Sequence, residues 1–323
     1  MNIIKFIKKI LIKKSFKNTR PKVVFSSGIL PQKTNVQNDN ETVAKLFNSV
    51  PKRFNKTKKF WNNQNISIFS VSKNCDAFKA NEISNEFLKI FAGAEALKKF
   101  KKYDVLKAVS KYQKLFYQCP VNENSGGINF TSGLNIFVIA YLLKPDIIVE
   151  SGVFQGKSSF FLKKASPKCN MYCFDINFKN LKYKNKQIRY FEKNWMDIDL
   201  RCQSNQTGFC FFDDHVNQAL RLTQASLRGF KYMIFDDSWP LEIPGCGWPP
   251  VPSIDSLINN EFKSQEEFQW IEGEKMWICK FTGKAKKLCA HAKKQIKNAI
   301  DLPDFYRQTG IGPVSFQKFI ELN

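Results

Sequence analysis

The sequence predicts an α/β protein: a doubly wound, mostly parallel sheet with a helical N-terminal extension. From residue 146 onward short apolar runs alternate with helical stretches, which is the pattern of βαβ units. The apolar runs are nearly continuous, as expected of strands buried on both faces of a sheet. Acidic residues or glycines follow several of these runs, where the carboxyl ends of parallel strands form a ligand crevice.

The N-terminal third is expected to form two regions ahead of this sheet. Residues 1–20 predict a basic amphipathic helix, because isoleucine and leucine recur at helical spacing with lysines between them. Residues 21–127 predict an irregular extension that becomes helical over 82–117. We expect residues 128–323 to form the α/β domain.

Within the α/β domain a helix over 134–143 is expected to end before Pro145. Five strands then follow, with helices after the first and the fourth. The predicted strands are DIIVE, NMYCFD, IRYFEKN, GFCFFDD and FKYMIFDD, and the helices are KSSFFLKKA and VNQALRLTQASLRG. Two later stretches, EFQWIEGEKMWICKF and GPVSFQKFIEL, are expected to complete the sheet.

Composition and charge narrow the function classes. Hydrophobic residues make up 43% of the 323 residues, which excludes global disorder. The net charge is +23, but residues 1–120 carry 25 basic and 7 acidic groups, against 26 and 21 in residues 121–323. The basic excess therefore lies outside the α/β domain, and we expect no nucleic-acid partner. A general compositional bias toward lysine is the other explanation of this charge.

The cysteines and the N-terminus indicate a cytoplasmic protein. Nine cysteines, without a repeated C-x-x-C spacing, fit reduced thiols. No apolar run approaches the roughly 18 residues that span a membrane. The lysines of residues 1–14 suit peripheral contact with an anionic membrane, on its inner face, while a frayed terminus or a helix docked on its own domain are the alternatives.

The segment VESGVFQGKSS contains the first candidate site. A strand ends near Glu150, a turn contains Gly152 and Gly156, and a helix starts near Ser158. Glycines allow close backbone approach, and a helix N-terminus offers N–H donors. The spacing is not the G-x-G-x-x-G of dinucleotide sites, and Glu150 would repel a phosphate. This segment therefore favours a cationic or neutral nucleoside ligand.

Acidic residues follow three further strands. Asp175 follows the second strand, where a carboxylate can accept hydrogen bonds from both ribose hydroxyls, although a plain strand-end aspartate is the alternative. Two acidic doublets follow the fourth and fifth strands, the first with an adjacent histidine. Such carboxylates repel one another unless a cation bridges them, and hard oxygen ligands suit Mg²⁺, Mn²⁺ or Ca²⁺. The alternative is that these aspartates cap helices, which would explain Asp214 but not two acidic doublets at neighbouring strand ends. The doublets are Asp213–Asp214, followed by His215, and Asp236–Asp237.

Taken together, VESGVFQGKSS, CFD, FFDDH and MIFDD resemble class I S-adenosylmethionine-dependent methyltransferases, which have a Rossmann-like fold. The closer resemblance is to metal-dependent O-methyltransferases, including sugar-modifying and cephalosporin-hydroxylase-like members, over about residues 128–240. The resemblance implies an O-methyltransferase that uses S-adenosylmethionine and a divalent metal, Mg²⁺ first. Its acceptor would be a hydroxyl of a sugar, a glycan or another small molecule.

The resemblance also implies a role for each matched residue. His215 is the candidate general base, because the lysine that follows such a histidine in related enzymes is here Asn217. By position rather than by resemblance, Trp195 at the end of the third strand is expected near the adenine. Trp239 and Trp248, beside a proline- and glycine-rich loop, are expected near the acceptor, with a packing role as the alternative. The implied cofactor-binding residues are Glu150, Gly152, Gln155, Gly156, Ser158, Asp175 and Asp213; the catalytic residues are His215 and Asp214; the metal ligands are Asp214, Asp236 and Asp237, with Asp213 as the substitute for Asp214.

Two other function classes stay open at this stage. One is an altered, hydroxylase-like enzyme of the same fold, for which the absence of the catalytic lysine leaves room. The other is a non-catalytic protein that binds a membrane surface through its basic N-terminal third. A nucleic-acid methyltransferase is disfavoured, because no Asn-Pro-Pro-Tyr-like motif for a flipped base occurs.

Overall fold

The structure is a computed structural model, and it describes most of the chain from residue 77 onward. The predicted amphipathic helix over 1–20 lies outside the described residues, as do Trp239 and Trp248. No helix within the described part is long and apolar enough to cross a membrane. The described ranges are 77–121, 127–238, 252–264, 267–272, 275–280, 283–309 and 316–323.

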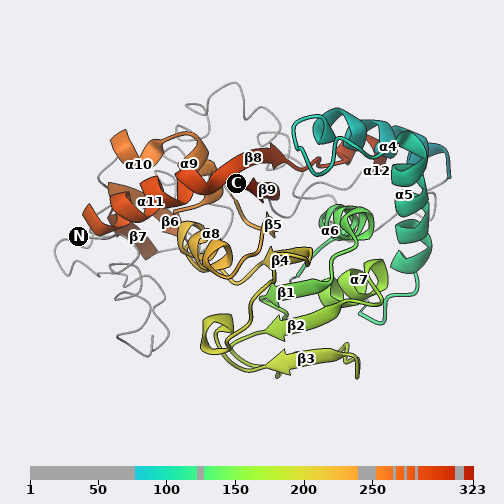
Figure 1. Cartoon of the computed structure of the whole chain (residues 1–323), viewed down its shortest axis with the longest axis horizontal. Coiled ribbons are helices and arrows are strands. Elements are labelled where there is room, and N and C mark those ends of the chain that lie inside the picture. The colour runs from blue at the N-terminus through green and yellow to red at the C-terminus, as the bar shows by residue number, and fades with distance from the viewer. Residues whose placement is uncertain are drawn as a thin grey trace, which may run out of the picture.

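A seven-stranded sheet, in the order β3-β2-β1-β4-β5-β9-β8, lies at the centre of the described residues (Figure 1). All pairs among β1 to β5 are parallel, whereas β9 runs antiparallel to both of its neighbours. This strand order is typical of the methyltransferase Rossmann-like fold, and it confirms the predicted fold class. The strands are β1 (Ile147–Ser151), β2 (Asn170–Phe174), β3 (Ile188–Phe191), β4 (Gly208–Phe212), β5 (Tyr232–Phe235), β8 (Ile296–Asp301) and β9 (Lys318–Leu322).

Helices cover both faces of the sheet, which is why the central strands are apolar throughout. Every residue of β1 and β4 is buried. Successive side chains of a strand point to opposite faces, so Ile148 joins the core on one face and Val149 the core on the other. Helices α6 (Phe130–Leu143) and α7 (Lys157–Ala165) form the first layer, and α8 (Gln218–Leu227), α9 (Ile254–Ile258) and α11 (Gly283–Gln295) form the second.

The predicted helix before the sheet is confirmed at its end and begins earlier than expected. The Asn129 side chain caps α6 by accepting a hydrogen bond from the Ser132 backbone N–H over 2.9 Å. This cap satisfies an N–H group that the first helical turn leaves without a partner. The helix ends at Lys144, which has a left-handed conformation before Pro145.

The single helical stretch predicted over 82–117 is instead two helices, α4 (Ala77–Phe91) and α5 (Lys102–Phe116). The intervening residues form turns, and α5 restarts with a capping box in which Asp104 accepts from the Lys101 N–H. Both helices share the apolar core of the sheet's α6 layer. A Cβ at Gly133 would lie 2.5 Å from the Tyr112 hydroxyl, so glycine at this position permits the close α5–α6 contact.

The last part of the chain departs from the prediction in two places. The EFQWIEGEKMWICKF stretch forms a hairpin, β6 (Glu267–Glu272) with β7 (Lys275–Lys280), but it is a separate two-stranded sheet, so the expectation that it completes the main sheet is wrong. The C-terminal stretch does join the main sheet as β9. Strand β8 was not predicted, because it follows α11 without a break. Short helices are η2 (Trp195–Asp197), α10 (Glu261–Ser264) and α12 (Tyr306–Thr309).

The turns after β1 and β4 meet at the carboxyl edge of the sheet. Gly152 has φ +92°, and a Cβ there would lie 2.1 Å from the Asp213 carbonyl oxygen. The Asp213 N–H donates to the Ser151 carbonyl over 2.8 Å. Glycine at 152 is therefore required both by its backbone conformation and by the neighbouring strand.

We predict that Gly152→Ala destabilises the protein by about 3 kcal/mol or more, because strain at positive φ adds to a steric clash with backbone. Urea unfolding measures this change. Gly283→Ala is the matched control, since a Cβ at Gly283 meets nothing within 4 Å; its effect should stay within about 0.5 kcal/mol. Equal stability of the two variants would contradict the prediction.

Candidate functional site

The candidate site lies where the strand order reverses. From β1 the chain continues to β2 on one side, and later to β4 on the other, so the turns after β1 and β4 flank the topological switch point. Ligands of open α/β sheets bind in the crevice at this point. The turns after β1, β2, β4 and β5 all reach this edge, as the acidic pattern of the sequence predicted.

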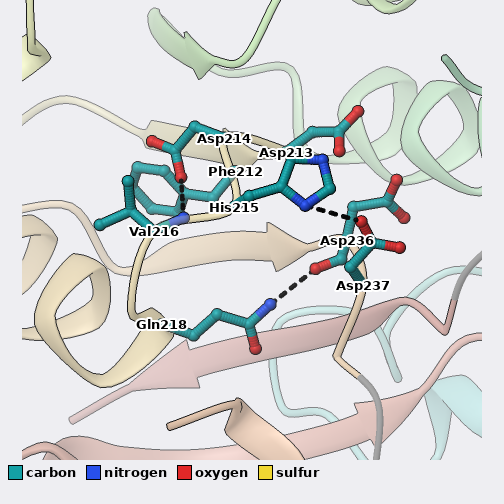
Figure 2. A pocket seen from close by; sticks show the side chains of 8 residues that line it. All are labelled: Phe212, Asp213, Asp214, His215, Val216, Gln218, Asp236 and Asp237. Atoms are coloured by element: carbon teal, nitrogen blue, oxygen red, sulfur yellow. Dashed lines mark hydrogen bonds and ion pairs between the residues drawn. The ribbon is translucent and has the colours of Figure 1, made fainter. Parts of the chain in front are cut away.

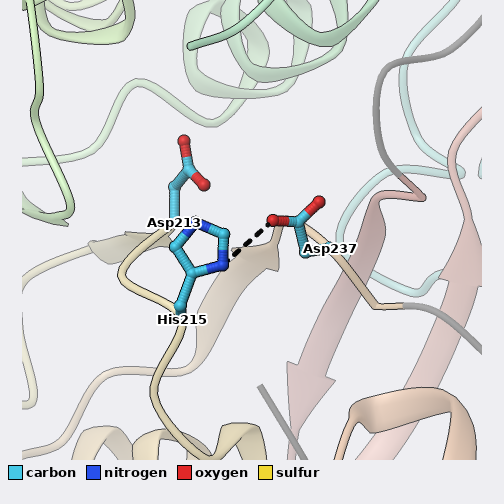
Figure 3. A group of neighbouring side chains, drawn as sticks. All are labelled: Asp213, His215 and Asp237. Carbon is cyan, nitrogen blue, oxygen red and sulfur yellow. Dashed lines mark ion pairs between the residues drawn. The ribbon is translucent and has the colours of Figure 1, made fainter. Parts of the chain in front are cut away.

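Three side chains from the turns that follow β4 and β5 converge there. Asp213, His215 and Asp237 each offer a ligand atom, and the three atoms lie within 4.8 Å of one another (Figure 3). His215 Nδ1 lies 3.3 Å from Asp237 Oδ2, and the His215 side chain is 42% exposed. Two carboxylates and an imidazole are a donor set that a divalent metal accepts. The residues therefore fit a metal ion by their chemistry and their spacing.

The backbone is strained at two of these three residues. His215 has φ 52° and Asp237 has φ 51°, which are left-handed conformations that are uncommon outside glycine, although Asp and His adopt them more often than most residues. Such strain costs of order 1–3 kcal/mol for each residue and persists where surrounding contacts enforce it. These conformations coincide with the converging side chains, which makes the edge a candidate site.

Asp213 experiences strong electrostatic repulsion. Burial raises its pKa well above the usual range, and the charges of Asp236, Asp237 and Asp214 raise it further. Asp236 is 6% exposed and lines the same shallow hollow as Asp213 and Asp237 (Figure 2). A bound cation would relieve this repulsion and favour the ionised carboxylates. The acidic cluster is thus complementary to positive charge.

Asp214 lies in this group of acids by sequence but makes different contacts. Its carboxylate accepts hydrogen bonds from Arg221 Nε over 2.8 Å and from Ser151 Oγ over 2.5 Å, and it forms an ion pair with Arg221 Nη2 over 2.8 Å. The structure does not bring Asp214 together with Asp237, because buried Arg221 draws its carboxylate toward α8. Asp213, which the sequence named as the substitute, takes the place predicted for Asp214 among the candidate metal ligands.

Asn217, which stands where the resemblance would put a lysine base, serves as a helix cap. Its side chain accepts a hydrogen bond from the Leu220 N–H over 3.0 Å and begins α8. Next to it, Gln218 Nε2 donates to the Asp236 carbonyl over 2.6 Å (Figure 2). These two residues connect the start of α8 to the β5 edge of the site.

Glu150 was predicted to contact the cofactor, but the structure places it in the interior. It is fully buried among β1, β2 and α7, and it accepts hydrogen bonds from Ser159 Oγ over 2.5 Å and from Cys173 Sγ over 3.1 Å. Burial raises its pKa to about 7, although hydrogen bonds from Ser158, Ser159 and Cys173 oppose the rise. Its Oε1 atom has no hydrogen-bond partner. Glu150 therefore does not face the crevice.

Asp175 fixes the turn after β1. Its Oδ2 accepts hydrogen bonds from the Val153 and Phe154 N–H groups over 2.8 and 2.9 Å, and its Oδ1 accepts from Ile176 over 2.6 Å. Ribose binding by Asp175 stays a prediction, and four amide donors already share the carboxylate, since the Asn177 N–H also donates to Oδ1 over 3.4 Å. Phe154, 37% exposed, and Ile176, 68% exposed, flank it and were not predicted.

The rest of the β1–α7 turn packs against the segment after β2. The Gln155 carbonyl accepts from the Lys182 and Tyr183 N–H groups over 3.1 Å, and a Cβ at Gly156 would lie 3.0 Å from Leu181. The Gln155 and Ser158 side chains are buried. Direct cofactor contact by these three residues stays a prediction, while the structure gives them a role in shaping the turn.

Two further residues differ from the sequence-based expectations. Trp195 is fully buried and packs against Phe212 and Phe230, so the expectation that it contacts adenine is wrong in this structure. Arg221 was missed. No local signal marks it, because its partner Asp214 lies seven residues upstream, beyond the range of i,i+4 pairing.

No family model matches the chain, and no curated protein matches it. Solved structures similar to it include an O-methyltransferase from Bacillus cereus in complex with SAH (10% identity, 74% of this chain, 99% of that chain, TM-score 0.35). TomG, an O-methyltransferase from Streptomyces achromogenes in complex with SAM, has 11% identity over 74% of this chain and 99% of its own, with a TM-score of 0.38. The structure described as cmcI-D160 Mg-SAM has 12% identity over 65% and 84%, with a TM-score of 0.33. Likeness at this level assigns no activity, ligand or family to this chain.

We predict that the unfolding free energy of the Glu150→Gln variant increases relative to that of the wild type as the pH rises. The folded protein binds the Glu150 proton more tightly than the unfolded chain does, so wild-type stability falls as the pH rises from about 4.5 to about 7. Glutamine stays neutral, and the difference in unfolding free energy should shift in its favour by roughly 2 kcal/mol between pH 5 and 8. Urea unfolding at both pH values measures it, and an unchanged difference would refute the prediction.

Proposed function

We propose that this protein is an S-adenosylmethionine-dependent O-methyltransferase. A divalent metal, with Mg²⁺ as the first candidate, would assist methyl transfer to a hydroxyl of a sugar, a glycan or another small molecule. The observation that carries the proposal is the convergence of Asp213, His215 and Asp237 at the carboxyl edge of a methyltransferase-type sheet, beside its switch point. The acceptor class rests on the sequence resemblance.

The charge and shape of the crevice support this cofactor. S-adenosylmethionine carries a sulfonium cation and no phosphate, and the edge carries carboxylates rather than a phosphate cradle. Phe154 and Ile176 offer exposed apolar surface on either side of Asp175, which suits a nucleoside with its base against apolar atoms and its ribose at a carboxylate. Gly152 allows the turn after β1 to approach Asp213 closely.

Asp213 and Asp237 are the proposed metal ligands, and Asp236 adds negative charge beside them. A bound divalent metal would act as a Lewis acid and lower the pKa of the acceptor hydroxyl. His215 is the proposed general base. Its Nδ1 lies 3.3 Å from Asp237 Oδ2, and a proton on Nδ1, donated to this carboxylate, would leave Nε2 as the nitrogen that accepts a proton.

The first test is calorimetric titration of the full-length protein with S-adenosylmethionine, and separately with Mg²⁺. We expect Asp175→Ala to weaken cofactor binding at least tenfold and to leave Mg²⁺ binding within about twofold, because it lies on the nucleoside side of the edge. Asp237→Asn should show the reverse pattern. No binding of S-adenosylmethionine would overturn the proposal; Mg²⁺ binding alone would then favour an altered enzyme of the same fold.

A second test separates the two roles open to His215. We expect His215→Asn to keep Mn²⁺ affinity within about threefold of the wild type, because a general base is not needed to hold the metal. Electron paramagnetic resonance of Mn²⁺ measures this affinity, with Asp237→Asn as the positive control for loss. A loss in His215→Asn as large as that in Asp237→Asn would make His215 a ligand and not the base.

A further inference from the structure

Arg221 is a buried charge directly behind the candidate metal site. It lies in the first turn of α8, and its side chain is 3% exposed. Its Nε donates to Asp214 Oδ2 over 2.8 Å, its Nη2 forms an ion pair with the same oxygen over 2.8 Å, and its Nη1 donates to Gln224 over 2.8 Å and to Asn194 over 3.1 Å. A guanidinium with this many fixed partners has a single orientation.

Asp214 is held from two elements, α8 and β1, and from within its own turn. Its Oδ2 accepts from Arg221 on α8 and from Ser151 Oγ at the end of β1, while its Oδ1 accepts from the Val216 N–H over 3.2 Å. Asp214 stands between Asp213 and His215 in the chain. Anchoring its side chain therefore fixes the backbone from which both of these candidate site residues project.

The strained conformation of His215 needs such an anchor. A non-glycine residue at φ 52° relaxes to a lower-energy conformation unless its surroundings enforce it. The contacts that flank His215 on the N-terminal side are those of Asp214, and on the C-terminal side those of Val216, which itself donates to Asp214. The Asp214–Arg221 pair is the link between this turn and the rigid helix α8.

We propose that Arg221 is a positioning residue for the metal site. Through Asp214 it holds the turn from Asp213 to Val216 so that Asp213 and His215 face Asp237, and it thereby sets the affinity for a divalent cation. This inference rests on the metal site of the proposed function. Arg221 acts through Asp214 rather than on the metal, and Asp214 is an anchor rather than a ligand.

An electrostatic role and a positioning role of Arg221 predict opposite changes in metal affinity when the side chain is removed. Arg221 is a cation near a cation site, so removing its charge alone would strengthen metal binding. Loss of the anchor would instead weaken binding, because the ligands would no longer be preorganised. The sign of the change in metal affinity therefore distinguishes a positioning role from a purely electrostatic one.

The experiment measures Mn²⁺ affinity by electron paramagnetic resonance for the full-length wild type, Arg221→Met and Arg221→Lys, with urea unfolding in parallel. Arg228 provides the matched control. It is a partly buried arginine at the other end of α8, donates to the Met196 and Ile198 carbonyls over 2.9 and 2.5 Å, and makes no contact with Asp214. Arg228→Met should therefore lower stability without changing the metal site.

We expect Arg221→Met to weaken Mn²⁺ binding by about tenfold, the lower end of the effect of removing a direct hydrogen-bond partner of a metal ligand, because Arg221 acts one residue further away through Asp214. Arg228→Met should bind within about twofold of the wild type. Arg221→Lys keeps the charge but cannot contact Asp214, Gln224 and Asn194 together, so it should also weaken binding. If Arg221→Met fails to fold, the Mn²⁺ affinity of Arg221→Lys tests the positioning role instead.

Each outcome bears on a different part of the inference. Unchanged or tighter binding in the Arg221 variants, with a wild type that binds Mn²⁺, would overturn the positioning role and leave the proposed function standing. Equal weakening in Arg221→Met and Arg228→Met would also overturn it, as an effect of stability alone. A wild type that binds no Mn²⁺ would overturn the metal-assisted function, and the inference with it.

Discussion

The contact on which the site depends is the meeting of two backbone turns at the ends of β1 and β4. Gly152 leaves room for the Asp213 carbonyl, and the Asp213 N–H donates to the Ser151 carbonyl. The Ser151 hydroxyl then reaches Asp214 on the same turn. One turn faces the proposed cofactor and the other carries the proposed metal ligand, so their relative position is set by main-chain contacts rather than by flexible side chains.

Around this contact, buried charges are used for architecture as much as for chemistry. Asp175 holds the β1 turn through amide groups, Asp214 is neutralised by Arg221, and Lys318 pairs with Asp255 and Asp301 beside β5. Asp213 differs from these groups, because burial and the charges of Asp236, Asp237 and Asp214 all raise its pKa. Under the proposed function, a bound cation would relieve this repulsion.

The fold and the edge that carries the site could be predicted from the sequence, because strands buried on both faces leave long apolar runs and parallel strands end at a common edge. The orientation of individual side chains could not. Asp213 and Asp214 are adjacent and chemically identical, and the tertiary contacts of Asp214 with Arg221 and Ser151 leave Asp213 as the one that faces Asp237. Glu150 shows the same limit, since it precedes the edge by one residue and points into the core between β2 and α7.

The position of β9 has a consequence for how the protein folds. Its residues 318–321 pair with residues 232–235 of β5, across more than 80 intervening residues. Pairings this distant in sequence form slowly, because a long loop must close before the contact stabilises it. The nascent sheet from β3 to β5 would meanwhile expose β5 as an unpaired edge, which is the kind of surface that recruits chaperones or other chains. The same strand end carries Asp236 and Asp237, so the candidate site lies beside the strand edge that this distant pairing covers.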